Sequence, residues 1–324
     1  MNTPLNRRHF LARTSTAVAA ASLAPLAGRV FAEAPRTRMT LCLSPGSIGV
    51  NADQRATIVL AQQHGFTSVD PFASFLAGLS DEARAELVAE MQAKKLVFGS
   101  AGLPVDFRGD EARFNQGLRE LPKLAAALQK SGVTRIGTWI SPGSGTRTYL
   151  SNFKFHQQRL TEVARVCKDN GLRFGLEYVG TPSARARSKY PFIHSLPEMR
   201  ELIAAIGTGN VGVVIDSWHW WTAGDTEADL LALRNEDVVS IDLNDAPAGL
   251  TLEQQQDGQR ELPAATGVIP VATFLKALQK IDCDAPVRAE PFNKKLNDLP
   301  NDEACAATIT ALRKAMATLD TGAA

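Results

Sequence analysis

The chain of 324 residues is 44% hydrophobic and 21% charged, with 24 Gly and 17 Pro. This ordinary composition excludes a disordered, collagenous or coiled-coil chain. The net charge is +1, but residues 1–32 contain four arginines and no acid, so the rest of the chain has 31 basic residues against 34 acidic ones. Such a slightly acidic body has no electric field that would attract nucleic acid or an anionic membrane.

The first 32 residues have the three parts of a secretory signal. The basic segment Asn6-Arg7-Arg8-His9-Phe10-Leu11 precedes an apolar run over residues 17–26, and Val30-Phe31-Ala32 then fits a small-residue cleavage site. The apolar run is too short to span a bilayer. The Arg-Arg-x-Phe-Leu core resembles a twin-arginine signal, which exports folded proteins. We therefore expect residues 1–32 to be a twin-arginine-type signal peptide and the mature protein to be periplasmic, with no membrane attachment after cleavage.

From residue 39 onward, short apolar runs alternate with amphipathic segments. The runs are rich in Val, Ile, Leu and Phe, as strands buried on both faces should be. We predict eight strands, at residues 39–44, 67–71, 96–100, 134–139, 173–178, 211–216, 238–243 and 286–290. The predicted helices cover residues 52–64, 80–94, 111–130, 155–170, 197–206, 226–233, 271–280 and 302–317.

Eight strand–helix units in about 290 residues predict a single-domain α/β protein, a (β/α)₈ TIM barrel over residues 33–324. The segment after the first strand, Ser44-Pro45-Gly46-Ser47-Ile48-Gly49, is a poor match to Gly-x-Gly-x-x-Gly, which disfavours a dinucleotide-binding sheet. The four cysteines form no Cys-x-x-Cys pair, which argues against a zinc ribbon or a thioredoxin-like site. Buried thiols are expected, with one disulfide as the alternative.

Carboxylic acids stand at the ends of the last four predicted strands: Glu177, Asp216, Asp242 and Glu290. Because consecutive strand ends adjoin at the C-terminal rim of a barrel, the four should converge. Without compensation they would repel one another and raise each other's pKa. A divalent cation would resolve that conflict, since hard cations take oxygen ligands. We therefore predict a metal site, although any single acid at a strand end would more often be a capping or solvated residue.

Candidate substrate-binding residues surround these acids. His219 follows Asp216 in Asp216-Ser217-Trp218-His219-Trp220-Trp221, where imidazole could hydrogen-bond a hydroxyl and an aromatic face such as Trp218 could stack on a sugar. At least one of these tryptophans is expected to be core. Arg260 is a candidate for holding an oxyanion, with a plain surface arginine as an equal alternative. Trp139 is a further candidate for substrate contact.

In these motifs the chain resembles the xylose isomerase-like barrel superfamily of sugar isomerases and epimerases, which also includes endonuclease IV. The matching stretches are Leu176-Glu177-Tyr178-Val179-Gly180, residues 211–220, Leu243-Asn244-Asp245-Ala246-Pro247, residues 260–269 and Arg288-Ala289-Glu290-Pro291-Phe292. The resemblance implies metal ligands at Glu177, Asp216 and Glu290, with Mn²⁺ or Mg²⁺ as the usual ion. At the third ligand position relatives often have His, whereas this chain has Asp242. An all-oxygen set favours Mn²⁺, Mg²⁺ or Ca²⁺ over Zn²⁺. The Arg-x-Leu-Pro segment also departs from the family pattern at residues 264–266.

The resemblance implies a metal-dependent isomerase or epimerase of a non-phosphorylated sugar or polyol. Glu177 and Glu290 would be the catalytic pair that removes and returns a proton through an enediolate. The alternative is a lyase or hydrolase that acts on a 3-keto-sugar or glycoside with the same metal site. A non-catalytic sugar-binding protein is a weaker alternative, and so is an apurinic endonuclease, which would need a His-rich three-zinc cluster. The expected partner is a small carbohydrate and no nucleic acid; the oligomeric state stays open, a homodimer included.

Overall fold

A computed structural model describes residues 37–320, so the predicted signal peptide lies outside the described residues. Its parallel strands follow the spatial order β3-β2-β1-β11-β10-β9-β7-β5-β4. They comprise β1 (Thr40–Leu43), β2 (Ser68–Val69), β3 (Val97–Phe98), β4 (Ala101–Gly102), β5 (Arg135–Trp139), β7 (Arg173–Glu177), β9 (Val211–Asp216), β10 (Val238–Leu243) and β11 (Pro286–Ala289).

The two ends of this order belong to one stretch of chain. Strands β3 and β4 are separated only by Gly99 and Ser100; β3 pairs with β2, and β4 pairs with β5. Together they occupy the third strand position of a closed barrel, which gives eight strand positions in all. The predicted TIM barrel is thus confirmed, and each of the eight predicted strands overlaps an observed one.

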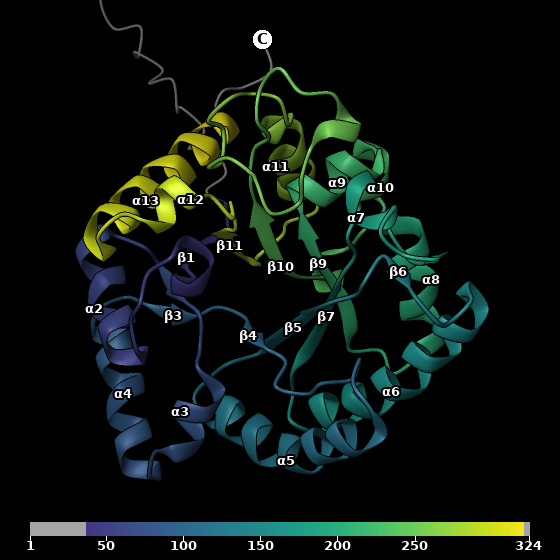
Figure 1. The fold of residues 1–324 in the computed structure, drawn as a ribbon. Helices are drawn as coiled ribbons and strands as arrows, with labels where there is room; N and C mark the ends of the chain where they lie inside the picture. The colour runs from purple at the N-terminus through teal and green to yellow at the C-terminus, as the bar shows by residue number, and fades with distance from the viewer. Residues whose placement is uncertain (1–36, 321–324) are drawn as a thin grey trace, which may run out of the picture. The chain divides into compact units, whose positions relative to one another are not determined.

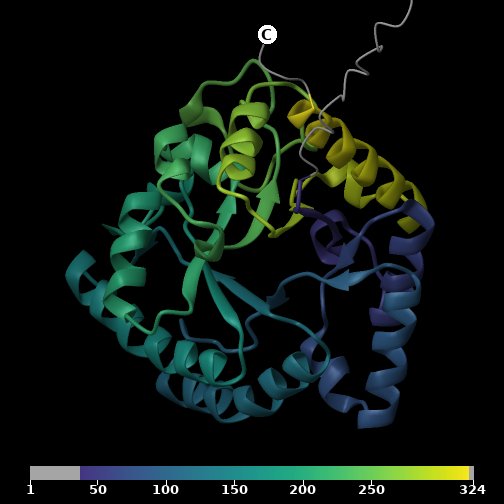
Figure 2. The same ribbon diagram turned by 180° about the vertical axis from the view of Figure 1, so that it is seen from behind.

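Helices surround the strands as an outer ring (Figure 1 and, from behind, Figure 2). The longer ones are α2 (Gln54–His64), α4 (Asp81–Ala93), α5 (Glu111–Lys130), α6 (Tyr149–Asp169), α8 (Leu196–Ile206), α11 (Val271–Lys280) and α13 (Asn301–Met316). Shorter helices are α3 (Ala73–Gly78), α7 (Pro182–Arg185), α9 (Ser217–Ala223), α10 (Glu227–Leu231) and α12 (Lys294–Asn297), with 3₁₀ turns at Pro45–Ile48, Asn235–Asp237, Leu252–Gln254 and Ala317–Leu319. Within residues 37–320, none of the helices has the length and apolar character that a membrane span requires.

Side-chain caps fix several helix starts. Asp53, Ser80 and Asp110 each accept a hydrogen bond from the backbone N–H three residues later, which satisfies an otherwise unpaired donor. Gly65 ends α2 in the left-handed region, with φ 75°, where glycine has no steric penalty.

Three local predictions needed correction. Helix α6 begins at Tyr149, six residues earlier than expected, because Tyr149 and Phe153 pack against the core although the local sequence carries no clear start signal. Helices α3 and α9 were not predicted, and neither was the antiparallel pair of β6 (Gly143–Ser144) and β8 (Tyr190–Pro191). These elements are short, so tertiary contacts rather than local periodicity define them.

The barrel interior below the C-terminal rim is tightly filled. Gly137 on β5 and Gly175 on β7 are register partners, and a Cβ added to either would lie 2.9 or 2.8 Å from Cγ2 of Val214. The two glycines thus make room for the Val214 side chain, which forms part of a floor beneath the rim. All four cysteines are free and buried, as the preferred interpretation expected.

Candidate active site

The structure brings the four predicted acids together at the C-terminal rim. Asp216 and Asp242 are register partners on β9 and β10, Glu177 ends β7, and Glu290 directly follows β11. One oxygen from each of the four carboxylates lies within 4.8 Å of the others. This cluster of Glu177, Asp216, Asp242 and Glu290 is called the acid cluster below.

Asp216 is held in place by three donors. Its Oδ1 accepts hydrogen bonds from the backbone N–H of Trp218 (2.7 Å) and from Nδ2 of Asn244 (3.0 Å), and its Oδ2 accepts one from Nη1 of Arg260 (2.8 Å). Asp216 is therefore also the N-cap of α9. Burial raises the pKa of Asp216 to about 6, against the lowering effect of Arg260.

Asp242 is paired with an arginine that the sequence analysis did not assign. Arg288 donates to Asp242 through Nε and, at 2.9 Å, through Nη2, while its Nη1 lies 3.4 Å from Oδ2 of Asp70. Arg288 stands two residues before Glu290, and alternate residues of a strand share a face. That alternation was the signal that could have placed Arg288 in the site.

Glu177 and Glu290 are the acids whose charge is least compensated. Oε1 of Glu177 is buried and has no hydrogen-bond partner among the described residues. Burial, and then the charges of Glu290, Asp242 and Asp216, raise the pKa of Glu177 well above its usual value. Burial and the charge of Asp242 raise the pKa of Glu290 to about 8. Carboxyl groups shifted in this way can exchange protons near neutral pH.

The carboxylates around the acid cluster outnumber the arginines that face them. The buried Arg260 and the partly buried Arg288 pair with members of the acid cluster and also with Asp257 and Asp70, so six carboxylates share two guanidiniums and the net charge is negative when the acids are ionised. Each carboxylate has about four lone-pair sites, so the arginine bonds do not exhaust Asp216 and Asp242 as ligands. The unpartnered Oε1 of Glu177 offers another ligand atom. The residues present thus fit a metal ion, and the all-oxygen cluster fits a hard one.

His219 on α9 completes one side of the site. Its Nδ1 lies 3.2 Å from the backbone N–H of Gly180, and its Nε2 lies 3.3 Å from Nη2 of Arg260; both of these groups are donors. A neutral imidazole accepts at one nitrogen and carries its proton on the other, so the ring can accept from only one of the two. Nε2 also lies 3.8 Å from Oε1 of Glu177 and 3.9 Å from Oδ2 of Asp216. Burial and the charge of Arg260 lower the pKa of His219 to about 3, so the ring beside the acid cluster is neutral.

Two cavities meet at the acid cluster. The first, of about 510 Å³, is lined by His219, Arg260 and Phe292 among others, and the second, of about 310 Å³, by Ser100 and Arg108 among others. We call them the His219 cavity and the Arg108 cavity. Glu177, Glu290 and Trp139 line both. Trp139 is 48% exposed at the junction of the two cavities, and its contact with a sugar stays a prediction.

The structure places Trp218 and Arg260 elsewhere than the sequence analysis expected. Trp218 is fully buried and its indole N–H donates to Oγ1 of Thr181 (2.8 Å). It lines neither of the two cavities, so the expected substrate contact is wrong for Trp218, which packs 5.4 Å from the guanidinium of Arg260 instead. Arg260 is buried among Asp216, Asp257 and Glu290 rather than on the surface. Its partner Asp257 carried no signal in the sequence.

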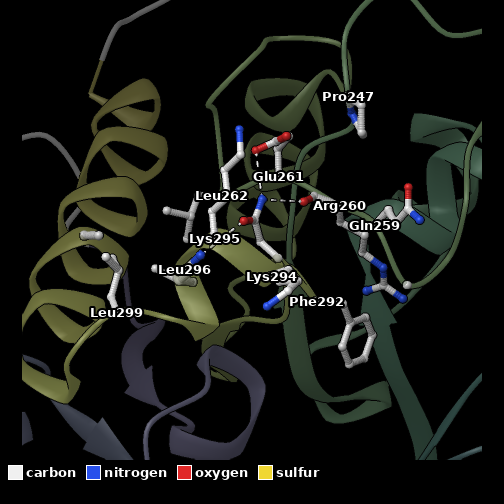
Figure 3. Close-up of a pocket in the computed structure, with 13 residues that line it drawn as sticks. Pro247, Gln259, Arg260, Glu261, Leu262, Phe292, Lys294, Lys295, Leu296 and Leu299 are labelled. Atoms are coloured by element: carbon white, nitrogen blue, oxygen red, sulfur yellow. Dashed lines mark hydrogen bonds between the residues drawn. The ribbon is translucent and has the colours of Figure 1, made fainter.

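A larger hollow, of about 740 Å³, lies beside the acid cluster but contains none of its four acids. Figure 3 shows it between the loop around Arg260 and the segment from Phe292 to Leu299. Asn293 closes this hollow toward the barrel by donating to the carbonyl oxygen of Arg260 (3.0 Å) and to Oε2 of Glu261 (3.1 Å). Arg260 and Phe292 line both this hollow and the His219 cavity, so the hollow borders the outer side of the site wall.

Comparison with known proteins assigns the family. The sequence profile described as "Xylose isomerase-like TIM barrel" matches residues 58–315. An inosose isomerase of Bacillus velezensis is 22% identical over 283 residues, which are 82% of this chain and 92% of that protein. The chain therefore belongs to the xylose isomerase-like TIM barrel family.

Solved structures of other proteins have the same fold. A xylose isomerase domain protein from Alicyclobacillus acidocaldarius is 30% identical, with a TM-score of 0.77 over 87% of this chain and 99% of that one. The IOLI protein, solved with a bound zinc atom, is 20% identical with a TM-score of 0.70, over 87% of this chain and 98% of that one. A D-psicose 3-epimerase from Clostridium cellulolyticum H10, solved with D-tagatose, is 18% identical with a TM-score of 0.64, over 87% and 99%.

Proposed function

We propose that this member of the xylose isomerase-like TIM barrel family is a divalent-metal-dependent isomerase or epimerase of a non-phosphorylated sugar or polyol. The observation that carries the proposal is the meeting of Glu177 and Glu290 at the junction of two cavities, beside two further acids. A substrate at this junction contacts both carboxylates at once. The named activities of relatives, inosose isomerase and D-psicose 3-epimerase, support the reaction class.

The acid cluster would hold the metal, with Mn²⁺ or Mg²⁺ favoured by its four carboxylates. The zinc in the IOLI structure makes Zn²⁺ the alternative. When bound, the ion would polarise the carbonyl and the adjacent hydroxyl of the substrate and lower the pKa of the neighbouring C–H group. Arg260 and Arg288 would keep Asp216 and Asp242 oriented toward it.

The protein's own groups would move the proton. Glu177, through the carboxylate oxygen that does not bind the metal, would remove a proton from the carbon next to the carbonyl, and Glu290 would return it from the other side of the sugar. The neutral ring of His219, whose Nε2 borders the acid cluster, would form a hydrogen bond with a substrate hydroxyl. Trp139 would stack on the sugar face.

Proton exchange with solvent tests this proposal. Purified protein, stripped with EDTA and reloaded with Mn²⁺, Mg²⁺ or Zn²⁺, would be incubated in D₂O with inososes and with free ketoses such as D-tagatose. The expected result is metal-dependent deuterium incorporation, seen by NMR, at the carbon next to the carbonyl, and its loss in Glu177→Gln. Loss of a substituent β to the carbonyl would assign a lyase instead. Binding of sugar without any exchange, with and without metal, would refute an isomerase.

We also propose that the protein is exported to the periplasm through residues 1–32. The paired Arg7-Arg8 before a short apolar run supports this proposal. Replacing both arginines by lysine should leave the protein in the cytoplasm, as measured by fractionation and immunoblotting. Unchanged export of the double variant would contradict a twin-arginine signal, and a variant with Arg13→Lys alone is the matched control.

A further inference from the structure

The Arg108 cavity contains a cation that forms no close ion pair within residues 37–320. Arg108 lies in the loop between β4 and α5, and only the longer-range attraction of Asp106 and Glu177 acts on its guanidinium. The nearby Asp106 is turned away: its Oδ1 accepts from the backbone N–H of Gly109 (2.9 Å), and its Oδ2 lies 3.9 Å from Nη1 of Arg113. Arg260 and Arg288, by contrast, each face two or more carboxylates.

The guanidinium of Arg108 is held in a fixed position without such a partner. Its Cζ lies 4.0 Å from the ring centroid of Trp139 and 4.3 Å from that of Phe107, and its Nη2 donates to Oγ1 of Thr138 (3.3 Å). Stacking between aromatic rings orients the planar group at little cost in hydration, because guanidinium is weakly hydrated. Burial lowers the pKa of Arg108 to about 10, so the group remains charged at neutral pH.

Unsatisfied polar atoms share this cavity. Nε of Arg108 is buried and has no hydrogen-bond partner among the described residues, and the same holds for Oγ of Ser100, a residue only 5% exposed. Both residues line the Arg108 cavity together with Glu177 and Trp139. Buried donors without partners are costly in a folded protein, and a bound ligand commonly satisfies them. An oriented guanidinium and a hydroxyl that line one cavity, each with an unpartnered polar atom, match an anionic oxygen pair.

We propose that the substrate carries an anionic group, and that Arg108 with Ser100 binds this group in the Arg108 cavity while the carbonyl of the substrate lies at the acid cluster. The planar guanidinium fits a carboxylate best, so the substrate class is a sugar acid, such as a uronate or keto-acid of a sugar, rather than a neutral sugar. This inference rests on the proposed function for the location of the reacting carbon. Arg108 is thus a specificity-determining residue, and the fixed distance between it and Glu177 selects the length of the substrate.

Paired neutral and acidic sugars test the inference. D-glucose and D-fructose would be titrated against D-glucuronate and D-fructuronate by calorimetry, with D-glucose 6-phosphate as a second anionic probe. Since a hydrogen bond to a charged group is worth about 1.5–3 kcal/mol, the acidic probes should bind the wild type about tenfold more tightly, or better, than the neutral ones. A preference for the phosphate would keep the anion site and change the anionic group.

Three variants assign the effect to Arg108. Arg108→Met should weaken the binding of acidic probes about tenfold more than that of neutral probes and so remove the preference, whereas Arg108→Lys should keep part of it. Arg147→Met is the matched control, because Arg147 also stacks on an aromatic ring, 3.7 Å from the centroid of Phe155, but lies outside both cavities. Circular dichroism would establish that each variant folds, and Arg108→Lys replaces Arg108→Met as the test if the latter does not.

The results separate this inference from the proposed function. Equal binding of acidic and neutral probes by the wild type, absence of binding by both, or equal weakening of both in Arg108→Met would overturn the anion site. Deuterium exchange in a neutral sugar that is insensitive to Arg108→Met would do the same and leave the isomerase intact. Tight, Arg108-dependent binding of a uronate that never exchanges deuterium would refute the isomerase and keep the anion site.

Discussion

The two ends of the barrel both carry clustered charges, but with opposite balance. At the C-terminal end, the acid cluster outnumbers its arginines, and Glu177 has an oxygen without a partner. At the N-terminal end, Asp284 accepts hydrogen bonds from Nη2 of Arg135 (2.7 Å) and, at 3.4 Å, from Nη2 of Arg173, with Arg38 3.6 Å away. We call the latter group the Asp284 cluster.

The pKa shifts express the same contrast. Burial opposes ionisation of Asp284, but Arg135 and Arg173 outweigh it and lower the pKa of Asp284, whereas the pKa of Glu177 and that of Glu290 are raised. A charge with a lowered pKa stabilises the fold, while a raised pKa means that folding works against the ionised form. In a TIM barrel, stability is typical of the N-terminal end and catalysis of the C-terminal end. The comparison thus predicts opposite effects of removing charge at the two ends.

The largest effect should be on turnover at the C-terminal end. Glu290→Gln should lower the rate of deuterium exchange by about 10³-fold, since general acid–base groups contribute 10²–10⁴-fold. The free energy of unfolding of the metal-free protein should stay unchanged or rise, because the raised pKa of Glu290 means that folding works against its ionised form. Exchange kinetics and urea denaturation measure the two quantities. Glu227→Gln, at a surface pair with Lys280, is the control, and a large loss of stability in Glu290→Gln would break the contrast.

The charged residues of the C-terminal end could be predicted from the sequence better than those of the N-terminal end. The acids of the C-terminal end could be predicted because each directly follows an apolar strand, and strand ends adjoin in a barrel. The strand-alternation rule would also have placed Arg288 beside Glu290. Arg260 was a candidate, but its pairing with Asp216, 44 residues earlier, depends on a loop that the sequence leaves undefined.

The residues that the sequence did not indicate come from loops or from the opposite end. Arg108 lies in a loop and gains its place by stacking on Trp139, a contact that has no local pattern. Trp218 was expected at the substrate, but helix α9, which directs it into the core, is too short for periodicity to show. The Asp284 cluster joins the starts of β5 and β7 to the segment before β11, and only closure of the barrel brings these together.

The second prediction concerns metal ions. A divalent ion bound to the acid cluster at 100 times its dissociation constant should raise the free energy of unfolding by about 2.7 kcal/mol. Thermal or urea unfolding with and without EDTA measures this increase. Glu177→Gln should reduce the stabilisation, and Asp284→Asn should keep all of it. An equal stabilisation of wild type and Glu177→Gln would place the ion elsewhere.

The third prediction addresses the N-terminal end. Asp284→Asn removes the acceptor of two arginine side chains and should lower the free energy of unfolding by about 2 kcal/mol, while deuterium exchange at saturating substrate stays within about twofold of the wild type. Asp298→Asn, at an exposed pair with Lys294, is the matched control and should change stability little. If Asp284→Asn lost activity as Glu290→Gln does, the division of roles between the two ends would be wrong.

The lowered pKa of Asp284 also predicts how the free energy of unfolding depends on pH. Because the pKa of Asp284 is lowered in the folded state, its contribution to stability is fully present above the unfolded pKa of about 3.9 and is lost as pH falls through the folded value. The difference in free energy of unfolding between wild type and Asp284→Asn should therefore be constant above pH about 5 and shrink below pH about 4. Urea denaturation from pH 3 to 8 measures the difference. A difference that grew at low pH would contradict the prediction, because it would require the pKa of Asp284 to be raised in the folded state.

The smallest effect should come from the exposed edge of the Asp284 cluster. The side chain of Arg38 is 56% exposed and lies 3.6 Å from Asp284, so solvent screens the pair. Arg38→Met should change the free energy of unfolding by less than about 0.5 kcal/mol. Arg135→Met should cost more, since the side chain of Arg135 is 13% exposed and donates at 2.7 Å. Equal losses in the two variants would mean that net positive charge, rather than buried hydrogen bonding to Asp284, is what stabilises the N-terminal end of the barrel.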